Sequence, residues 1–135
     1  MYRPSNYHSN GYAASERKDY RGQPDYFVMK RDAQGDTLWF YYYDSGFRGE
    51  DYVRDLAVDN SGNVFITGES DRTFAGNRDA VTIKLNSSGV QQWIARYPSP
   101  TAGETFANSI AVDATGNVYI AGQHRPSSGS YDWFA

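Results

Sequence analysis

Two acidic runs of this sequence have the residue types and spacing of a metal-binding loop. Asp59 stands four residues before Asn63, and Asp113 stands four residues before Asn117. Oxygen-rich runs bind Ca²⁺ in loops that also place a carboxylate at their far end, and these runs lack that carboxylate. The same residues also suit an Asx-type turn that closes a hairpin. We favour the turn and assign no metal ligand from the sequence.

Three further aspartates recur at equivalent places along the chain. Asp25, Asp79 and Asp132 each precede an apolar run, and Lys30 and Lys84 follow the first two of them by five residues. Opposite charges at such spacing suggest Asp–Lys pairs within or between repeats, which contribute little stability where they are exposed.

The remaining polar residues give little indication of catalysis. Glu50 and Glu104 recur, and paired carboxylates can hydrolyse glycosides, but nothing in the sequence sets the separation that this reaction needs. His8 and His124 are single and distant from each other. No Ser–His–Asp arrangement, phosphate-binding loop or nucleophile elbow can be identified. The sequence therefore predicts no catalytic residue, no cofactor and no enzyme.

The elements that carry these residues come from an internal repeat. The segment 55–68 returns as 109–122, a shift of 54 residues, and the same shift relates Asp25 and Trp39 to Asp79 and Trp93. Self-similarity of this length indicates a repeat architecture.

Each repeat predicts four short strands, at 56–58, 63–67, 80–85 and 92–97, joined by tight turns. Four antiparallel strands with apolar side chains on both faces predict an all-β fold of β-propeller-type blades, incomplete within one chain. We expect a polar leader or tail at 1–24 and a repeat domain at 25–135. That domain would hold a half blade at 25–43, a full blade at 55–97 and a partial blade at 109–135.

The repeat resembles the bacterial SBBP repeat, which is named for seven-bladed β-propellers. The resemblance lies in Val58-Asp59-x-x-Gly62-Asn63-Val64-Phe65-Ile66-Thr67-Gly68, followed by Asp79-x-x-Thr82-Ile83-Lys84-Leu85-Asn86-x-x-Gly89-x-x-x-Trp93. It implies a β-propeller of a secreted or cell-surface bacterial protein. It offers no catalytic residues, and this chain holds two to three repeats where the family name implies seven.

Composition restricts the partners. A net charge of −3 gives no electrostatic reason to expect nucleic acid, and no apolar run is long enough to span a bilayer. The chain has no cysteine, and its N-terminus lacks the apolar stretch of a signal peptide. An extracellular or cell-surface location is therefore expected from the resemblance alone.

Copies of the chain itself are the partner that the repeat count predicts. A chain that begins and ends inside a blade leaves strand edges open to pairing. The pair near 109–122 of one molecule could join the pair near 25–43 of the next, giving a ring or a filament. The alternatives are a fragment of a longer propeller, or a module that binds a glycan or a protein.

Aromatic side chains are the candidate interaction residues. Alternating aromatics could simply fill the space between neighbouring blades, but an unbroken run must place rings on both faces of its strand. Rings on a bare face would form an assembly surface. The candidates are Trp39, Tyr41, Tyr42, Tyr43, Trp93, Tyr97, Trp133 and Phe134.

Overall fold

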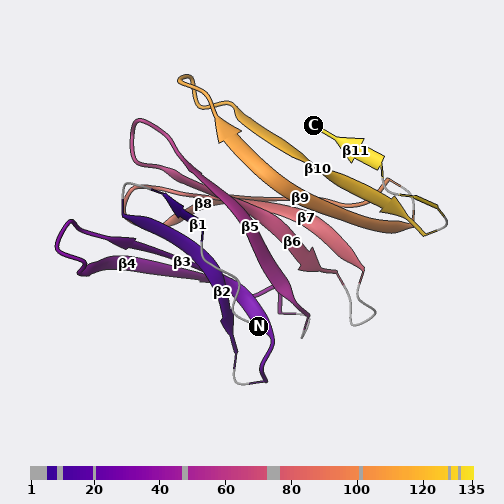
Figure 1. The fold of residues 1–135 in the computed structure, drawn as a ribbon, viewed down its shortest axis with the longest axis horizontal. Coiled ribbons are helices and arrows are strands. Elements are labelled where there is room, and N and C mark those ends of the chain that lie inside the picture. Colours follow the sequence, from indigo (N-terminus) through magenta and orange to yellow (C-terminus); the bar gives the residue numbers. More distant parts are fainter. Residues whose placement is uncertain are drawn as a thin grey trace.

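The structure is all-β. The computed structural model describes residues 6–8, 11–19, 21–46, 49–72, 77–100, 102–127, 129–130 and 132–135. Within these residues the strands form three antiparallel sheets, which we call the first, middle and third sheets (Figure 1). No helix suited to crossing a membrane occurs in this part of the chain. The predicted fold class is confirmed.

The first sheet begins earlier in the chain than the sequence predicts. Its order is β1 (Asn6–His8), β2 (Tyr12–Lys18), β3 (Pro24–Arg31) and β4 (Thr37–Tyr43). Strand β2 pairs with β3 along its whole length, so the expected boundary at residue 25 falls inside a sheet and the expected leader 1–24 is corrected. Strand β2 could not be predicted from its sequence pattern, because only Tyr12 and Ala14 are buried and the residues that follow them are polar.

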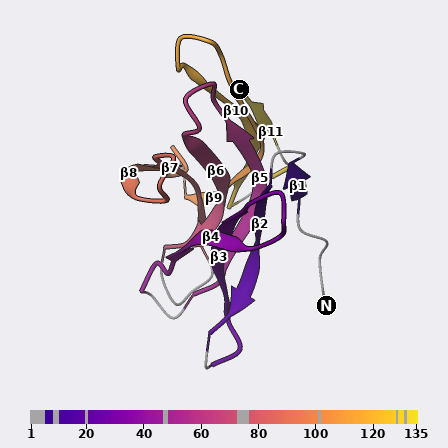
Figure 2. The same ribbon diagram turned by 90° about the vertical axis from the view of Figure 1, so that its left-hand side faces the viewer.

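The middle sheet has the strand order of a complete blade. It consists of β5 (Asp51–Val58), β6 (Val64–Asp71), β7 (Arg78–Leu85) and β8 (Gln91–Tyr97). Every residue of β6 is buried, because both of its faces are covered by another sheet. Figures 1 and 2 show this sheet between the other two.

The third sheet repeats the beginning of the middle one. Its strands are β9 (Gly103–Val112), β10 (Val118–Pro126) and β11 (Asp132–Phe134). Asp132 lies opposite His124 in the ladder, as Asp79 lies opposite Ser70 in the middle sheet. The short β11 is therefore the start of the third strand of a repeat.

The hairpin that joins β5 to β6 is an Asx turn. Asp59 accepts backbone N–H bonds from Ser61 and Asn63 at 2.9 Å each, and its second oxygen accepts the side-chain amide of Asn63 at 2.8 Å. Gly62 has a φ of 79°, in the left-handed region that favours glycine. The turn at Asp113 is built in the same way. Hydrogen bonds within the turn thus engage both carboxylate oxygens, which supports the turn interpretation.

Apolar side chains fill the two spaces between the sheets. The larger core cluster joins the first and middle sheets, and the smaller one joins the middle and third sheets. Fully buried members of the larger cluster are Tyr26, Val28, Val64, Ile66, Val81, Ile83 and Leu85. Because sheets stack through side chains that alternate along each strand, the molecule has two outer faces, one on the first sheet and one on the third.

Candidate interaction surfaces and a carboxylate cluster

Three of the predicted interaction residues hold the first and middle sheets together. Trp39, Tyr41 and Tyr43 lie on the side of β4 that packs against the larger core cluster. The indole of Trp39 donates to the carbonyl of Ser87 at 3.0 Å, and the hydroxyl of Tyr43 accepts from Arg96 at 3.1 Å. The structure therefore places these rings between sheets, where they fill space as the packing alternative expects.

Tyr42 points the other way and belongs to an aromatic cluster. Its ring centroid lies 5.0 Å from that of Phe27 and 5.4 Å from that of Phe40, which is exposed. The Arg17 guanidinium lies 5.2 Å above the Tyr42 ring. We define the outer face of the first sheet by Phe27, Met29, Phe40 and Tyr42. The sequence predicted that an unbroken aromatic run places rings on both faces of its strand, but Phe27 was not among the predicted residues.

The next candidates lie between the middle and third sheets. Trp93 packs against Phe65, with ring centroids 6.1 Å apart. Tyr97 and Phe134 border an open, mainly apolar groove of about 280 Å³ that Val118 and Ile120 also line. This groove marks the edge of a contact that is already formed, rather than a separate site.

Trp133 lies on the outer face of the third sheet and is largely exposed. Because side chains alternate, it shares that face with Tyr119 on β10, which is also exposed, and with Ala111 and Ala121. We define the outer face of the third sheet by these four residues. Sequence analysis missed Tyr119, although it stands 54 residues after Phe65 and so occupies the same place in the repeat.

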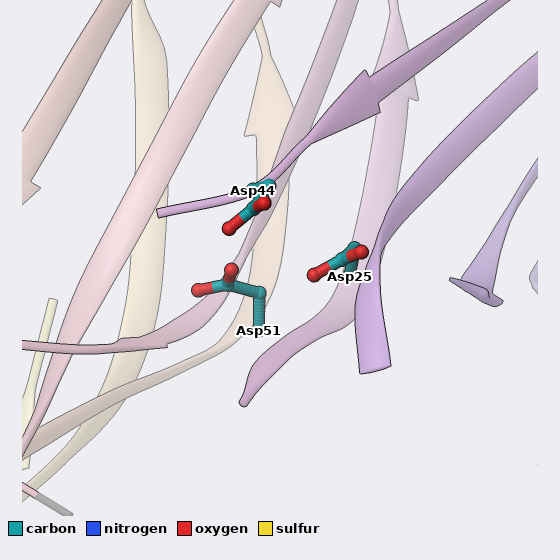
Figure 3. A group of neighbouring side chains, drawn as sticks. All are labelled: Asp25, Asp44 and Asp51. Carbon is teal, nitrogen blue, oxygen red and sulfur yellow. The ribbon is translucent and has the colours of Figure 1, made fainter. Parts of the chain in front are cut away.

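A carboxylate cluster is the polar site that sequence analysis missed. Asp25 at the start of β3, Asp44 just after β4 and Asp51 at the start of β5 approach one another (Figure 3). One oxygen from each lies within 4.8 Å of the others. Asp51 is fully buried and accepts the backbone N–H of Ser45 at 2.9 Å.

The cluster perturbs its own ionisation. Burial, together with the negative charges of Asp44 and Asp51, raises the pKa of Asp25 to about 6. Burial also raises the pKa of Asp51, although hydrogen bonds from Ser70 and Ser45 partly offset that effect. Three carboxylates at this separation are stabilised by a shared proton, or by a hard cation such as Ca²⁺ that prefers oxygen ligands.

The cluster is specific to one repeat. The positions 54 residues after Asp44 and Asp51 hold Pro98 and Thr105. The Thr105 hydroxyl accepts the backbone N–H of Ala80 at 2.8 Å, so the corresponding place in the next repeat holds a neutral hydrogen bond. Because Asp44 and Asp51 do not recur in the next repeat, comparing the repeats could not reveal the cluster.

The expected Asp–Lys pairs are wrong. The Asp79 carboxylate accepts hydrogen bonds from Arg72 and Arg96. The Lys84 ammonium instead lies 5.3 Å from the ring centroid of Phe65. Residues five apart on a strand point to opposite faces, so Asp79 and Lys84 cannot meet on one strand.

The repeated glutamates are held in ion pairs. The Arg78 guanidinium donates to Glu50 at 2.8 Å, and Arg125 pairs with Glu104. Arg125 also lines a polar pocket of about 530 Å³ beside Arg72. Both arginines of this pocket already pair with a carboxylate, so it offers an anion little net positive charge.

The three antiparallel sheets have the arrangement of β-propeller-type blades. The family model of the beta-propeller repeat SBBP matches residues 46–73 and 99–123, which confirms the predicted resemblance on these two stretches. A relative is a WD repeat-containing protein, L264, of Acanthamoeba polyphaga mimivirus. The two are 26% identical over 125 residues, and the match covers 76% of this chain and 9% of the relative.

Proposed function

We propose that this chain is a non-catalytic interaction module that associates with copies of itself, head to tail, as a ring or an extracellular fibre. The observation that carries the proposal is the pair of exposed, aromatic outer faces at opposite ends of the three-sheet stack. Contiguous exposed apolar surface is characteristic of an interaction site. The match to a WD repeat-containing relative adds support, because WD repeats build propeller blades.

The two faces differ, and this difference determines the symmetry. One is built around Phe27, Phe40 and Tyr42, and the other around Tyr119 and Trp133. Contact between unlike faces is heterologous, so it continues from molecule to molecule until a ring closes or a filament grows.

Blade completion, the route that the sequence suggested, conflicts with the structure. It required the edge of β3 to be open to the pair 109–122 of another copy. Strand β2 occupies that edge, from Lys18 opposite Pro24 to Tyr12 opposite Lys30. Association through the sheet faces needs no strand to be displaced.

A concentration series on size-exclusion chromatography with light scattering tests the proposal. The expected molar mass exceeds the 15.2 kDa of one chain and rises with concentration. Electron microscopy of the largest species then separates rings from fibres. A folded chain that keeps the mass of a monomer throughout the series would overturn the proposal.

A glycan-binding module is the second candidate, and the exposed indole of Trp133 favours it. Aromatic faces stack against apolar surfaces, including those of sugar rings. A glycan array with the wild-type chain and Trp133→Ala tests this alternative, which requires a defined glycan whose binding the substitution abolishes.

A further inference from the structure

We infer that the outer face of the third sheet packs on the outer face of the first sheet of a second copy, repeating between molecules the contact that joins sheets within one. This inference rests on the proposed self-association and specifies its interface. It follows from positions that recur in all three sheets and are covered in only two of them.

The first such position is an aromatic residue on the second strand of each sheet. Tyr12 and Phe65 are equivalent, because a lysine ammonium lies over each ring, Lys30 at 5.1 Å and Lys84 at 5.3 Å from the centroid. The 54-residue repeat makes Tyr119 the third member. Tyr12 is 5% exposed beneath the middle sheet and Phe65 is 1% exposed beneath the third, whereas Tyr119 is 58% exposed.

The second position lies on the third strand of each sheet and holds Tyr26, Ala80 and Trp133. The ladders establish this equivalence, since the three residues lie opposite Glu16, Glu69 and Gln123 respectively. Tyr26 and Ala80 are 0% exposed, and Trp133 is 78% exposed. Two independent positions therefore show the same pattern: buried, buried and open.

The outer face of the first sheet, which would receive the third sheet of another copy, also repeats positions that are buried within the molecule. Val81 and Ile83 lie on the side of the middle sheet that packs against the first sheet, and both are fully buried. Their counterparts 54 residues earlier are Phe27 and Met29, on the outer face of the first sheet, where both are partly exposed. This face thus has the apolar side chains of a receiving face, and none of the sheets formed by the described residues covers it.

The contacts within the molecule give the register between molecules. The Tyr26 hydroxyl lies 3.5 Å from the carbonyl oxygen of Val81 across the first interface. Because Trp133 is equivalent to Tyr26 and Phe27 to Val81, Trp133 of one copy should face Phe27 of the next. A second copy is the occupant, since this one chain supplies both halves of a contact that it already makes twice.

Cross-linking between single-cysteine variants tests this register. The wild-type chain has no cysteine, so Trp133→Cys and Phe27→Cys each carry one thiol. Mixed and treated with a short bismaleimide, they should give a covalent dimer in several-fold higher yield than Trp133→Cys mixed with Val90→Cys. Val90 is exposed but lies in a hairpin loop, outside both faces. Tyr42→Cys, an exposed neighbour of Phe27, gives a second pair if Phe27→Cys folds poorly.

The outcomes separate this inference from the proposed function. If the wild-type chain associates and both cysteine pairs cross-link no better than the Val90 control, this interface is overturned while self-association stands. If the wild-type chain remains a folded monomer at all concentrations, both are overturned. Preferential cross-linking of either pair in an associating chain supports both.

Discussion

Asp25 is the residue that should make stability depend on pH between about 4 and 6. Its pKa is raised to about 6 in the folded chain from an ordinary value of 3.8, so the folded state binds the proton more tightly than the unfolded state. The resulting stabilisation is fully present below pH 4 and is lost as the pH rises through about 6. Urea unfolding between pH 4 and pH 7 should therefore show a free energy of unfolding that falls with pH.

Asp25→Asn should weaken that dependence, because the amide does not titrate, while Asp51, whose pKa burial also raises, keeps its own contribution. Solvent screening at this partly exposed site limits the effect on the free energy of unfolding to about 1 kcal/mol. Matching pH profiles for the variant and the wild-type chain would contradict the assignment to Asp25.

Asp59 should contribute to stability through its turn rather than through a metal ion. Burial raises the pKa of Asp59, but the hydrogen bonds from Asn63 and Ser61 together lower it by more. The pKa is therefore below its ordinary value. Asp59→Ala should lower the free energy of unfolding by about 1–2 kcal/mol through loss of these bonds. Asn60→Ala, at an exposed position in the same turn, is the matched control and should change little. Measurement in the presence and absence of Ca²⁺ should give the same difference; a difference confined to Ca²⁺ would contradict the turn interpretation.

At the scale of the elements, burial by a neighbouring sheet should decide what an aromatic side chain contributes. Phe65→Ala should lower the free energy of unfolding by about 3–5 kcal/mol, because it leaves a cavity between the middle and third sheets. Tyr119→Ala, the equivalent change on the outer face, should alter the stability of the monomer by only about 0.5 kcal/mol. Urea titrations at low protein concentration compare the two variants, and equal losses would contradict the claim that burial by a neighbouring sheet decides the contribution.

The strands that could be predicted from the sequence are those whose residue pattern occurs in both copies of the repeat. Strands β6 and β10 share their apolar pattern and turn residues, so comparison of the two copies found both. Strand β2 differs, because Ser15 and Arg17 stand at the places that the buried Gly68 and Ser70 hold in β6. Its pairing with β3 depends on the tertiary ladder rather than on its own apolar pattern.

The candidate sites likewise fall into those that the sequence could predict and those that depend on the packing of the sheets. The aromatic positions could be found from alternation along a strand, but alternation does not say which face a neighbouring sheet covers. Trp39 and Tyr42 are three residues apart and share a residue class, yet one lies between sheets and the other on an outer face. Asp44 and Asp51 come together with Asp25 only because the chain passes from one sheet to the next at this point.

At the scale of the whole molecule, the three sheets form a stack, and we propose that its two outer faces complement each other. Tyr119→Lys should abolish self-association by placing a charge on the third sheet's outer face, where an unpaired charge is costly to bury. Val90→Lys, at a similarly exposed loop position, should associate like the wild-type chain. Sedimentation velocity distinguishes them, and loss of association in both variants would contradict a surface-specific effect.

The most direct test of head-to-tail stacking mixes two blocked chains. Tyr119→Lys blocks the third sheet's outer face, and Met29→Lys blocks that of the first sheet, while each variant keeps the opposite face intact. Light scattering should show each variant alone as a folded monomer of about 15 kDa. An equimolar mixture should give a dimer of twice that mass and nothing larger, because one usable pair of faces remains. A mixture that stays monomeric, or a single variant that still assembles, would contradict the account.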